Sequence, residues 1–218
     1  MLNTSLSLDF VVKPSTLKTN APLLIMLHGY GSDENDLFSF SSELPEELLI
    51  ISARAPYSMQ PFGNAWYAIN FDAEKGKWND NAQAQSSVEL IAKFIDEVSN
   101  VYAIHKNSVT LLGFSQGSIL SYAVALTYPE KVKNIIALSG YVNKDILPEN
   151  LNDQDYSHLD FYCSHGSVDQ VIPPDWARQT QPFLNSLNIK NTYSEFPVGH
   201  GVTPQNFYEF KEWLNNRI

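Results

Sequence analysis

Short apolar runs alternate with longer amphipathic stretches along nearly the whole chain. Apolar runs bounded by turn residues are typical of buried strands, and apolar residues at helical spacing are typical of surface helices. The strands that we predict are Leu6–Val12, Pro22–Leu27, Leu48–Ser52, Ser108–Leu112, Asn134–Leu138, Asp160–Ser164 and Thr192–Phe196. The helices that we predict are roughly Asp36–Glu43, Ala82–Val101, Gln116–Tyr128, Pro174–Leu187 and Pro204–Asn216.

The alternation of strands and helices indicates an α/β fold, because it is typical of a mostly parallel sheet with helices on both faces. The chain has 218 residues, a length that fits one domain with a full core. We therefore predict a single domain over residues 1–218, built on a mostly parallel sheet of about seven strands.

One long interval, Arg54–Asn81, contains no predicted helix or strand. Loops of such length inside a compact domain are usually functional or disordered. The aromatic and thioether side chains of this interval are Tyr57, Met59, Phe62, Trp66, Tyr67, Phe71 and Trp78. This content is too aromatic for a disordered linker, so we expect an ordered flap over residues 54–81 beside a functional site. The alternative is that these aromatic side chains cap the core.

Residues 113–117 read Gly113-Phe114-Ser115-Gln116-Gly117 and stand between a predicted strand and a predicted helix. A Gly-x-Ser-x-Gly in this context is the nucleophile elbow of α/β-hydrolases, a turn so tight that the flanking positions must be small. The helix that follows brings backbone N–H groups and a positive dipole end close to the serine. We expect Ser115 to be a nucleophile. The alternative is a Gly-bracketed turn with an idle serine.

A serine needs a base, and the base needs an acid that orients it; in this fold they follow the serine in the order acid, then His. The histidines beyond Ser115 are His158, His165 and His200. We expect His200 to be the base, because it follows the last strand and has a glycine on each side. The alternative is a loop His near a helix start. We expect His165 to be a packed structural residue.

Asp169 is the candidate acid, because it follows the penultimate predicted strand directly. From that position a carboxylate can reach a ring nitrogen of His200. Asp145, after the preceding strand, is the competing candidate. Asp175 lies at the start of a predicted helix, where the dipole stabilises a carboxylate.

A second oxyanion donor is expected in the loop after the strand that ends at Leu27. The sequence there is Leu27-His28-Gly29-Tyr30-Gly31, and its glycines let the backbone approach the site. We expect the backbone N–H groups of Tyr30 and Gln116 to form the oxyanion hole. A plain Gly turn is the alternative. A dinucleotide fingerprint does not fit, because Glu34 stands where a third glycine is required.

The composition narrows the class of protein and the partners. Hydrophobic residues make up 44% and charged residues 17%, as in soluble globular proteins. The net charge of −10 argues against nucleic acid and anionic membrane surfaces as partners. The single Cys163 excludes an internal disulfide and a multi-Cys metal site. The sequence shows neither a signal peptide nor a long apolar stretch, so we expect a cytoplasmic protein without stable membrane insertion.

The chain resembles the phospholipase/carboxylesterase family of small serine hydrolases, which includes acyl-protein thioesterases and bacterial carboxylesterases. The resembling segments are 27–31 (LHGYG), 54–56 (RAP), 65–67 (AWY), 113–117 (GFSQG), 138–140 (LSG), 165–169 (HGSVD), 171–173 (VIP) and 199–200 (GH). The resemblance implies a triad of Ser115, Asp169 and His200, with the N–H groups of Tyr30 and Gln116 as the oxyanion hole. It also implies an acyl groove near three residues, Trp66, Tyr141 and Val171.

Two positions depart from the pattern of acyl-protein thioesterases, which usually have Asp in place of Ser167 and Leu-Gly-Asp in place of residues 30–32. The second departure changes the mouth of the groove, so we do not assume specificity for lipidated proteins. The missing Asp at position 167 and the bulky Tyr30 together lead us to expect a short-to-medium acyl chain.

We therefore expect a serine hydrolase that cleaves carboxylic esters through an acyl-enzyme, with thioesters and lysophospholipids left open. The expected substrate is a small-molecule or lipid-like acyl ester, and the chemistry needs no metal or organic cofactor. A peptidase or lactone hydrolase on the same triad is one alternative, and a catalytically silent ligand-binding hydrolase fold is another. The sequence leaves a homodimer open.

Overall fold

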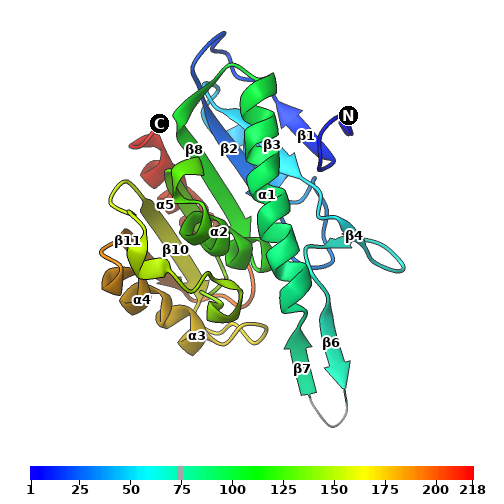
Figure 1. Cartoon of the computed structure of the whole chain (residues 1–218), viewed down its shortest axis with the longest axis vertical. Helices are drawn as coiled ribbons and strands as arrows, with labels where there is room; N and C mark the ends of the chain where they lie inside the picture. Colours follow the sequence, from blue (N-terminus) through cyan, green and yellow to red (C-terminus); the bar gives the residue numbers. More distant parts are fainter. Residues whose placement is uncertain (73–75) are drawn as a thin grey trace.

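A seven-stranded sheet forms the centre of the protein, in the order β1-β3-β2-β8-β9-β10-β11 (Figure 1). The computed structural model describes residues 1–72 and 76–218, with side chains outside residues 71–77. The strands of this sheet are β1 Phe10–Lys13, β2 Ala21–Leu27, β3 Leu49–Ala53, β8 Ile104–Phe114, β9 Asn134–Leu138, β10 Asp160–Gly166 and β11 Lys190–Phe196. Only β1 is antiparallel to its neighbour, so the predicted mostly parallel α/β fold is confirmed.

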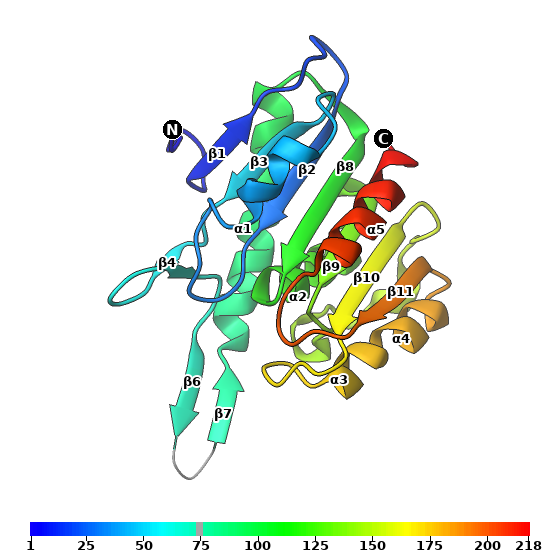
Figure 2. The ribbon, with the colours of Figure 1, turned by 180° about the vertical axis from the view of Figure 1, so that it is seen from behind.

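Helices cover both faces of the sheet. The α-helices are α1 Asn81–Val101, α2 Gln116–Thr127, α3 Pro174–Arg178, α4 Thr180–Ser186 and α5 Pro204–Asn215. Helices α1 and α2 pack on one face, and Figure 2 shows α5 on the other together with the 3-10 helix η1 (Leu37–Glu43). Alternate residues of β2 feed the two cores: Leu23 and Ile25 join the first, and Leu24 and Met26 join the second. This two-residue period makes the strand apolar throughout.

The predicted helix over Pro174–Leu187 is instead two short helices, α3 and α4, that meet at Gln179. Pro182 explains the break, because proline has no N–H to donate to the carbonyl of Arg178. The predicted helix at Asp36–Glu43 is the 3-10 helix η1.

We expected no helix or strand in the interval 54–81, but the structure has two short hairpins there. Their strands are β4 Tyr57–Ser58, β5 Asn64–Ala65, β6 Ile69–Asp72 and β7 Gly76–Asn79. The β6–β7 hairpin projects well beyond the body of the molecule (Figure 1). The side chain of Phe71 lies outside the described residues. Over the part of the chain that is described, no helix is both long and apolar enough to cross a membrane.

The strand order reverses between β2 and β8, because β3 lies on the outer side of β2 while β9 follows β8 on the other side. Ligands of open parallel sheets bind at such a switch point, beyond the carboxyl ends of the strands. Helix α2 comes very close to β2 here: a Cβ added to Gly117 would lie 2.0 Å from the carbonyl oxygen of Leu27. The glycine at 117 therefore sets how closely α2 approaches the sheet.

Replacing Gly117 by alanine should destabilise the protein, because the new methyl group must push backbone away from backbone. We expect Gly117→Ala to lower the free energy of unfolding in urea by about 3 kcal/mol. The control is Gly201→Ala, where an added Cβ would meet nothing within 4 Å, and there we expect a change within about 1 kcal/mol. Equal unfolding midpoints for the two variants would contradict the close-approach argument.

Candidate active site

Ser115 lies at the tip of the turn between β8 and α2, in a strained backbone conformation with φ 53° and ψ −113°. Such conformations cost on the order of 1–3 kcal/mol and persist only where the surroundings impose them. The Ser115 N–H donates to the carbonyl of Leu138 (2.9 Å), and its own carbonyl accepts from the N–H of Ile119 (3.0 Å). The sheet and the first turn of α2 thus hold the residue from both sides.

His200 connects Ser115 to Asp169. Its Nε2 lies 2.9 Å from Ser115 Oγ, and its Nδ1 lies 2.6 Å from Asp169 Oδ2. A carboxylate only accepts, so Nδ1 carries the proton and Nε2 is left as the acceptor for the serine hydroxyl. The loop between β11 and α5 carries His200 back over the turn, where its ring packs against Phe114 with centroids 5.0 Å apart. The structure thus brings the three predicted residues into one hydrogen-bonded chain.

Asp169 is held by its own loop as well as by His200. Its Oδ1 accepts from the backbone N–H groups of Val171 (2.8 Å) and Ile172 (3.0 Å). Burial opposes ionisation, but the hydrogen bonds from His200 and from these two N–H groups outweigh it and lower the pKa of Asp169 below its usual 3.8. The carboxylate therefore stays charged at neutral pH with a fixed orientation.

His165 lies beneath Asp169 and is fully buried. Its Nε2 is 2.9 Å from the carbonyl oxygen of Ile172 and 3.3 Å from Asp169 Oδ2. Burial lowers the pKa of His165, so the ring stays neutral and the contact with Asp169 is not an ion pair. The residue is packed, as we expected, but it packs directly under the acid. Asp145, the competing acid, is exposed in the 3-10 helix η3 (Lys144–Ile146).

Two backbone N–H groups beside Ser115 belong to peptide planes whose carbonyl ends are held by other groups. The carbonyl of Gly29 accepts from His28 Nδ1 (2.7 Å) and from the N–H of Ser32 (3.3 Å). The carbonyl of Ser115 accepts from α2. In a trans peptide the N–H points opposite to the C=O, so the N–H groups of Tyr30 and Gln116 point the other way. Neither has a hydrogen-bond partner among the described residues.

The β4–β5 hairpin anchors the Tyr30 loop. The N–H of Gly31 donates to the carbonyl of Asn64 (2.9 Å), and the N–H of Asn64 donates to the carbonyl of Ser32 (2.8 Å). The backbones are so close that a Cβ on Gly63 would lie 2.1 Å from the carbonyl oxygen of Gly31. The aromatic interval after β3 thus contributes to the site through its backbone.

A cavity of about 670 Å³ opens at Ser115 and His200. Its other lining residues are Tyr30, Tyr67, Ile69, Trp78, Asn79, Gln116, Ile119, Tyr141, Gln170, Val171, Ile172, Pro173 and Trp176. Two of the three predicted groove residues, Tyr141 and Val171, are among them. Trp66 is not: its side chain is fully buried in the core, which corrects its placement in the groove.

Sequence reasoning did not single out two of the exposed aromatic residues that line this cavity as groove residues. Trp78 comes from the β6–β7 hairpin, and Trp176 comes from α3, where its ring contacts Tyr141 with centroids 5.2 Å apart. Trp78 was counted among the aromatic side chains of the interval 54–81, which was a usable signal. Trp176 carries no motif, and only the turn between β10 and α3 brings it to the cavity.

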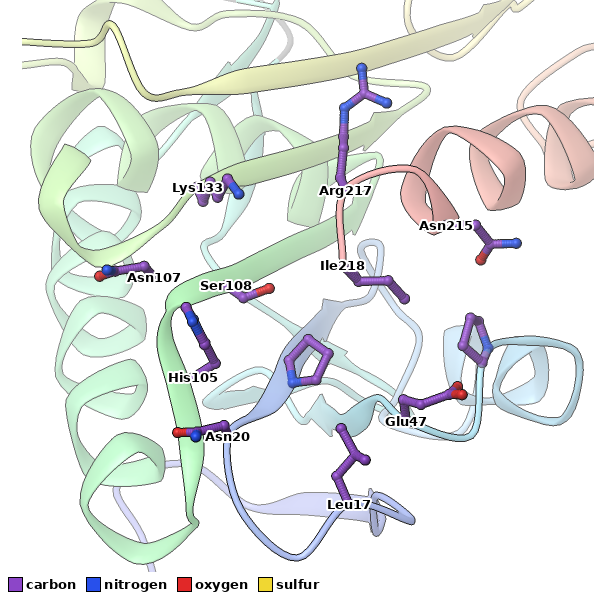
Figure 3. A pocket seen from close by; sticks show the side chains of 12 residues that line it. Leu17, Asn20, Glu47, His105, Asn107, Ser108, Lys133, Asn215, Arg217 and Ile218 are labelled. Atoms are coloured by element: carbon purple, nitrogen blue, oxygen red, sulfur yellow. The ribbon is translucent and has the colours of Figure 1, made fainter.

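A second cavity, of about 710 Å³, lies near the start of β8, at the amino ends of the strands (Figure 3). Residues from the start of β8, such as His105 and Ser108, line it together with Arg217 and Ile218 from the end of the chain. It contains none of the three hydrogen-bonded residues described above. Since parallel α/β sheets bind their ligands at the carboxyl ends of the strands, the cavity at Ser115 is the candidate active site.

Known proteins of similar sequence are esterases and thioesterases by name. Acyl-protein thioesterase 1 of Candida albicans is 25% identical over 232 residues, covering 98% of this chain and 99% of that protein. Lysophospholipase-like protein 1 of Mus musculus is 24% identical over 211 residues, covering 89% and 86%.

Solved structures agree with these relatives. Esterase PE8 superposes with a TM-score of 0.83 at 25% identity, covering 95% of this chain and 98% of its own. A carboxylesterase from Mesorhizobium loti superposes with a TM-score of 0.82 at 19% identity, which shows a shared fold, covering 99% and 98%. The sequence also matches the phospholipase/carboxylesterase family over residues 8–218. Since this match spans nearly the whole chain, the protein belongs to the phospholipase/carboxylesterase family.

Proposed function

We propose that the protein is a serine hydrolase that cleaves carboxylic esters through an acyl-enzyme. The observation that carries this proposal is the continuous hydrogen-bonded chain from Asp169 through His200 to Ser115 Oγ, at the mouth of an apolar cavity. The names of the relatives support the same class of reaction. Relatives named as a thioesterase and as lysophospholipase-like also favour thioesters and lysophospholipids as further substrates.

We propose a role for each residue, and the hydrogen-bonded chain supports it. Ser115 Oγ attacks the acyl carbon while His200 Nε2 takes its proton, and Asp169 stabilises the imidazolium that forms. The N–H groups of Tyr30 and Gln116 bind the oxyanion; one such donor is typically worth about 3 kcal/mol. His200 then gives the proton to the leaving alcohol. Water next attacks the acyl carbon while His200 takes its proton, and the acid is released as His200 returns the proton to Ser115 Oγ.

We propose that the acyl chain is of short-to-medium length and binds in this cavity. Its walls include Ile119 from α2, Tyr141 after β9, and Val171 after β10, so all three come from carboxyl-end loops or the helix of the elbow. Apolar walls favour the acyl side of the ester, since each buried CH₂ contributes about 0.8 kcal/mol. A cytoplasmic location and the exclusion of nucleic acid stay predictions, and a homodimer stays open.

Removing the nucleophile tests the proposal directly. Ser115→Ala should lower kcat on p-nitrophenyl butyrate by about 10⁴-fold or more and leave the fold intact, because the base and oxyanion hole have no group to act on. A fluorophosphonate probe should label the wild type and a control variant, Ser186→Ala in α4, but not Ser115→Ala. If a folded Ser115→Ala protein kept more than about a tenth of the activity, the assignment would fail.

The pH dependence should show one ionisation on the acid side. Only a neutral imidazole accepts the serine proton, so a histidine base should make the activity fall as the pH falls. Asp169 does not contribute a second step in this range, because its pKa is lowered below 3.8. We expect log kcat/KM to rise by about one unit per pH unit on the acid limb and then level off. A flat profile from about pH 5 to about pH 9 would argue against a histidine base.

Narrowing the cavity should shorten the preferred acyl chain. Val171→Trp should lower kcat/KM for the longest ester that the wild type uses well by about tenfold, the value of roughly two methylenes, while acetate changes little. The measurement is a p-nitrophenyl ester series from acetate to palmitate. The matched control is Val168→Trp, an exposed valine of the same loop that does not line the cavity. A Val171→Trp profile identical to that of the control would remove this residue from the acyl groove.

A further inference from the structure

Trp66 is fully buried, yet each of its polar groups is used. Its backbone N–H donates to Gln116 Oε1 (2.8 Å), and its indole Nε1 donates to the carbonyl of His28 (2.9 Å). Its own carbonyl accepts from Ser87 Oγ of α1. One residue therefore bonds to the turn after β8 and, separately, to the loop after β2.

These two segments carry the two N–H groups that face the active site. We propose that Trp66 is a positioning residue that fixes the spacing and relative orientation of the Tyr30 and Gln116 N–H groups. The inference rests on the proposed function, since it assigns a role in stabilising the oxyanion of that reaction. Trp66 does not touch the substrate cavity and acts through its neighbours.

On the β2 side, the indole holds the residue that orients the first peptide. His28 is buried, and its Nε2 accepts from the N–H of Ala55 (3.0 Å), so the neutral ring carries its proton on Nδ1. That proton goes to the carbonyl of Gly29, in the same peptide plane as the Tyr30 N–H. Because Trp66 holds the carbonyl of His28, both ends of this residue are fixed and the Gly29–Tyr30 plane cannot rotate freely.

On the β8 side, the backbone of Trp66 holds a side chain. Gln116 makes two hydrogen bonds to the same short segment: Oε1 accepts from Trp66, and Nε2 donates to the carbonyl of Tyr67 (2.8 Å). The side chain is buried, with 2% of its surface exposed. These two bonds fix the first residue of α2, whose N–H is the second oxyanion donor.

The sheet itself does not supply this link. The ladder between β2 and β8 ends at the pair Leu27 and Gly113, before either oxyanion peptide begins. Gly117 limits how closely the two segments approach, but a contact of that kind does not set angles. Beyond the last rung of the ladder, Trp66 hydrogen-bonds directly to both segments, and Asn64 adds bonds to the Tyr30 loop.

Errors in this spacing should affect the transition state more than the ground state. Oxyanion donors act on charge that develops only during the reaction, and losing one of them costs about 10²–10³-fold in kcat. A displacement of about 1 Å costs up to about 10²-fold. If the bridge is loosened but both N–H groups remain, the loss in kcat should therefore be smaller than the loss that follows removal of one donor.

The test compares Trp66→Phe with Trp213→Phe, both of which exchange a buried indole for a phenyl ring. Trp213 belongs to α5 and packs in the core between that helix and the sheet. Its Nε1 has no hydrogen-bond partner among the described residues. For Trp66→Phe we expect kcat/KM on p-nitrophenyl butyrate to fall by about 10- to 100-fold, with KM within about threefold of wild type. Trp213→Phe should retain wild-type kinetics.

A second readout separates positioning from general damage. The second readout is the affinity for a short-chain alkyl trifluoromethyl ketone, a transition-state analogue. Ser115 Oγ adds to the carbonyl carbon of this ketone, and the resulting oxyanion should lie between the two N–H groups. The affinity of the ketone for Trp66→Phe should fall by the same factor as kcat/KM. The affinity of the butyrate product, which forms no tetrahedral adduct, should stay within about threefold of wild type.

Gln116→Met provides an independent route, which also serves if Trp66→Phe does not fold. It removes the side-chain bonds but keeps the backbone N–H, and it should give a loss of the same kind in kcat and trifluoromethyl ketone affinity. The double variant should lose less than the product of the two single losses, because both break the same bridge.

The proposal is overturned if folded Trp66→Phe and Gln116→Met keep wild-type kcat and trifluoromethyl ketone affinity. It is equally overturned if the loss lies in KM and in butyrate affinity, since that pattern marks a binding-site wall. Failure of the proposed function looks different: the wild type would then hydrolyse no ester and would not react with a fluorophosphonate.

Discussion

The contact between the first turn of α2 and the end of β2 is the constraint on which the rest of the structure depends. Gly117 lies against the carbonyl of Leu27, and no larger residue fits there. This contact forces the chain to reverse within the turn and leaves Ser115 with a positive φ. The strain is offset by an apolar strand on one side of the turn and a fully buried helix on the other. The packed core thus holds Ser115 in this conformation and fixes the direction of its hydroxyl group.

The proposed acid and base are held differently from the serine, mainly by polar contacts. His200 and Asp169 lie on loops, so neither position is fixed by a ladder or by helix packing. Asp169 instead accepts two backbone hydrogen bonds from its own turn, and the buried ring of His165 lies beneath it. The carboxylate is therefore oriented before the imidazole binds to it. This order matters, because a carboxylate free to rotate would not select one tautomer of His200.

The sequence was sufficient for features that repeat or that occupy fixed places in a fold. Strands such as β2 were predictable from continuous apolar runs. The convergence of Ser115, Asp169 and His200 was predictable from their positions after β8, β10 and β11. The break between α3 and α4 was also readable in principle, because Pro182 cannot donate the hydrogen bond that a continuous helix needs.

Other features depend on three-dimensional contacts that no local pattern encodes. Trp66 is the clearest case. An aromatic residue in a long interval near a site suggests a wall of the substrate cavity. Trp66 is instead buried, and its hydrogen-bond partner Gln116 lies 50 residues later in the sequence. Its use becomes visible only when the donors and acceptors of a buried residue are all accounted for, since buried polar groups need partners.

The interval between β3 and α1 accordingly has two roles, one for its exposed residues and one for its inner residues. Its exposed residues, such as Trp78, stand at the cavity, where a change of side chain alters what fits. Its inner residues hold backbone: Asn64 binds the Tyr30 loop, and Trp66 binds both the elbow and the loop after β2. An active site built this way can change its substrate range through the outer layer while the inner layer keeps the geometry of the reaction. The exposed residues of this segment can then vary while its inner residues are constrained, because the inner residues are hydrogen-bonded to the segments that carry the proposed catalytic groups.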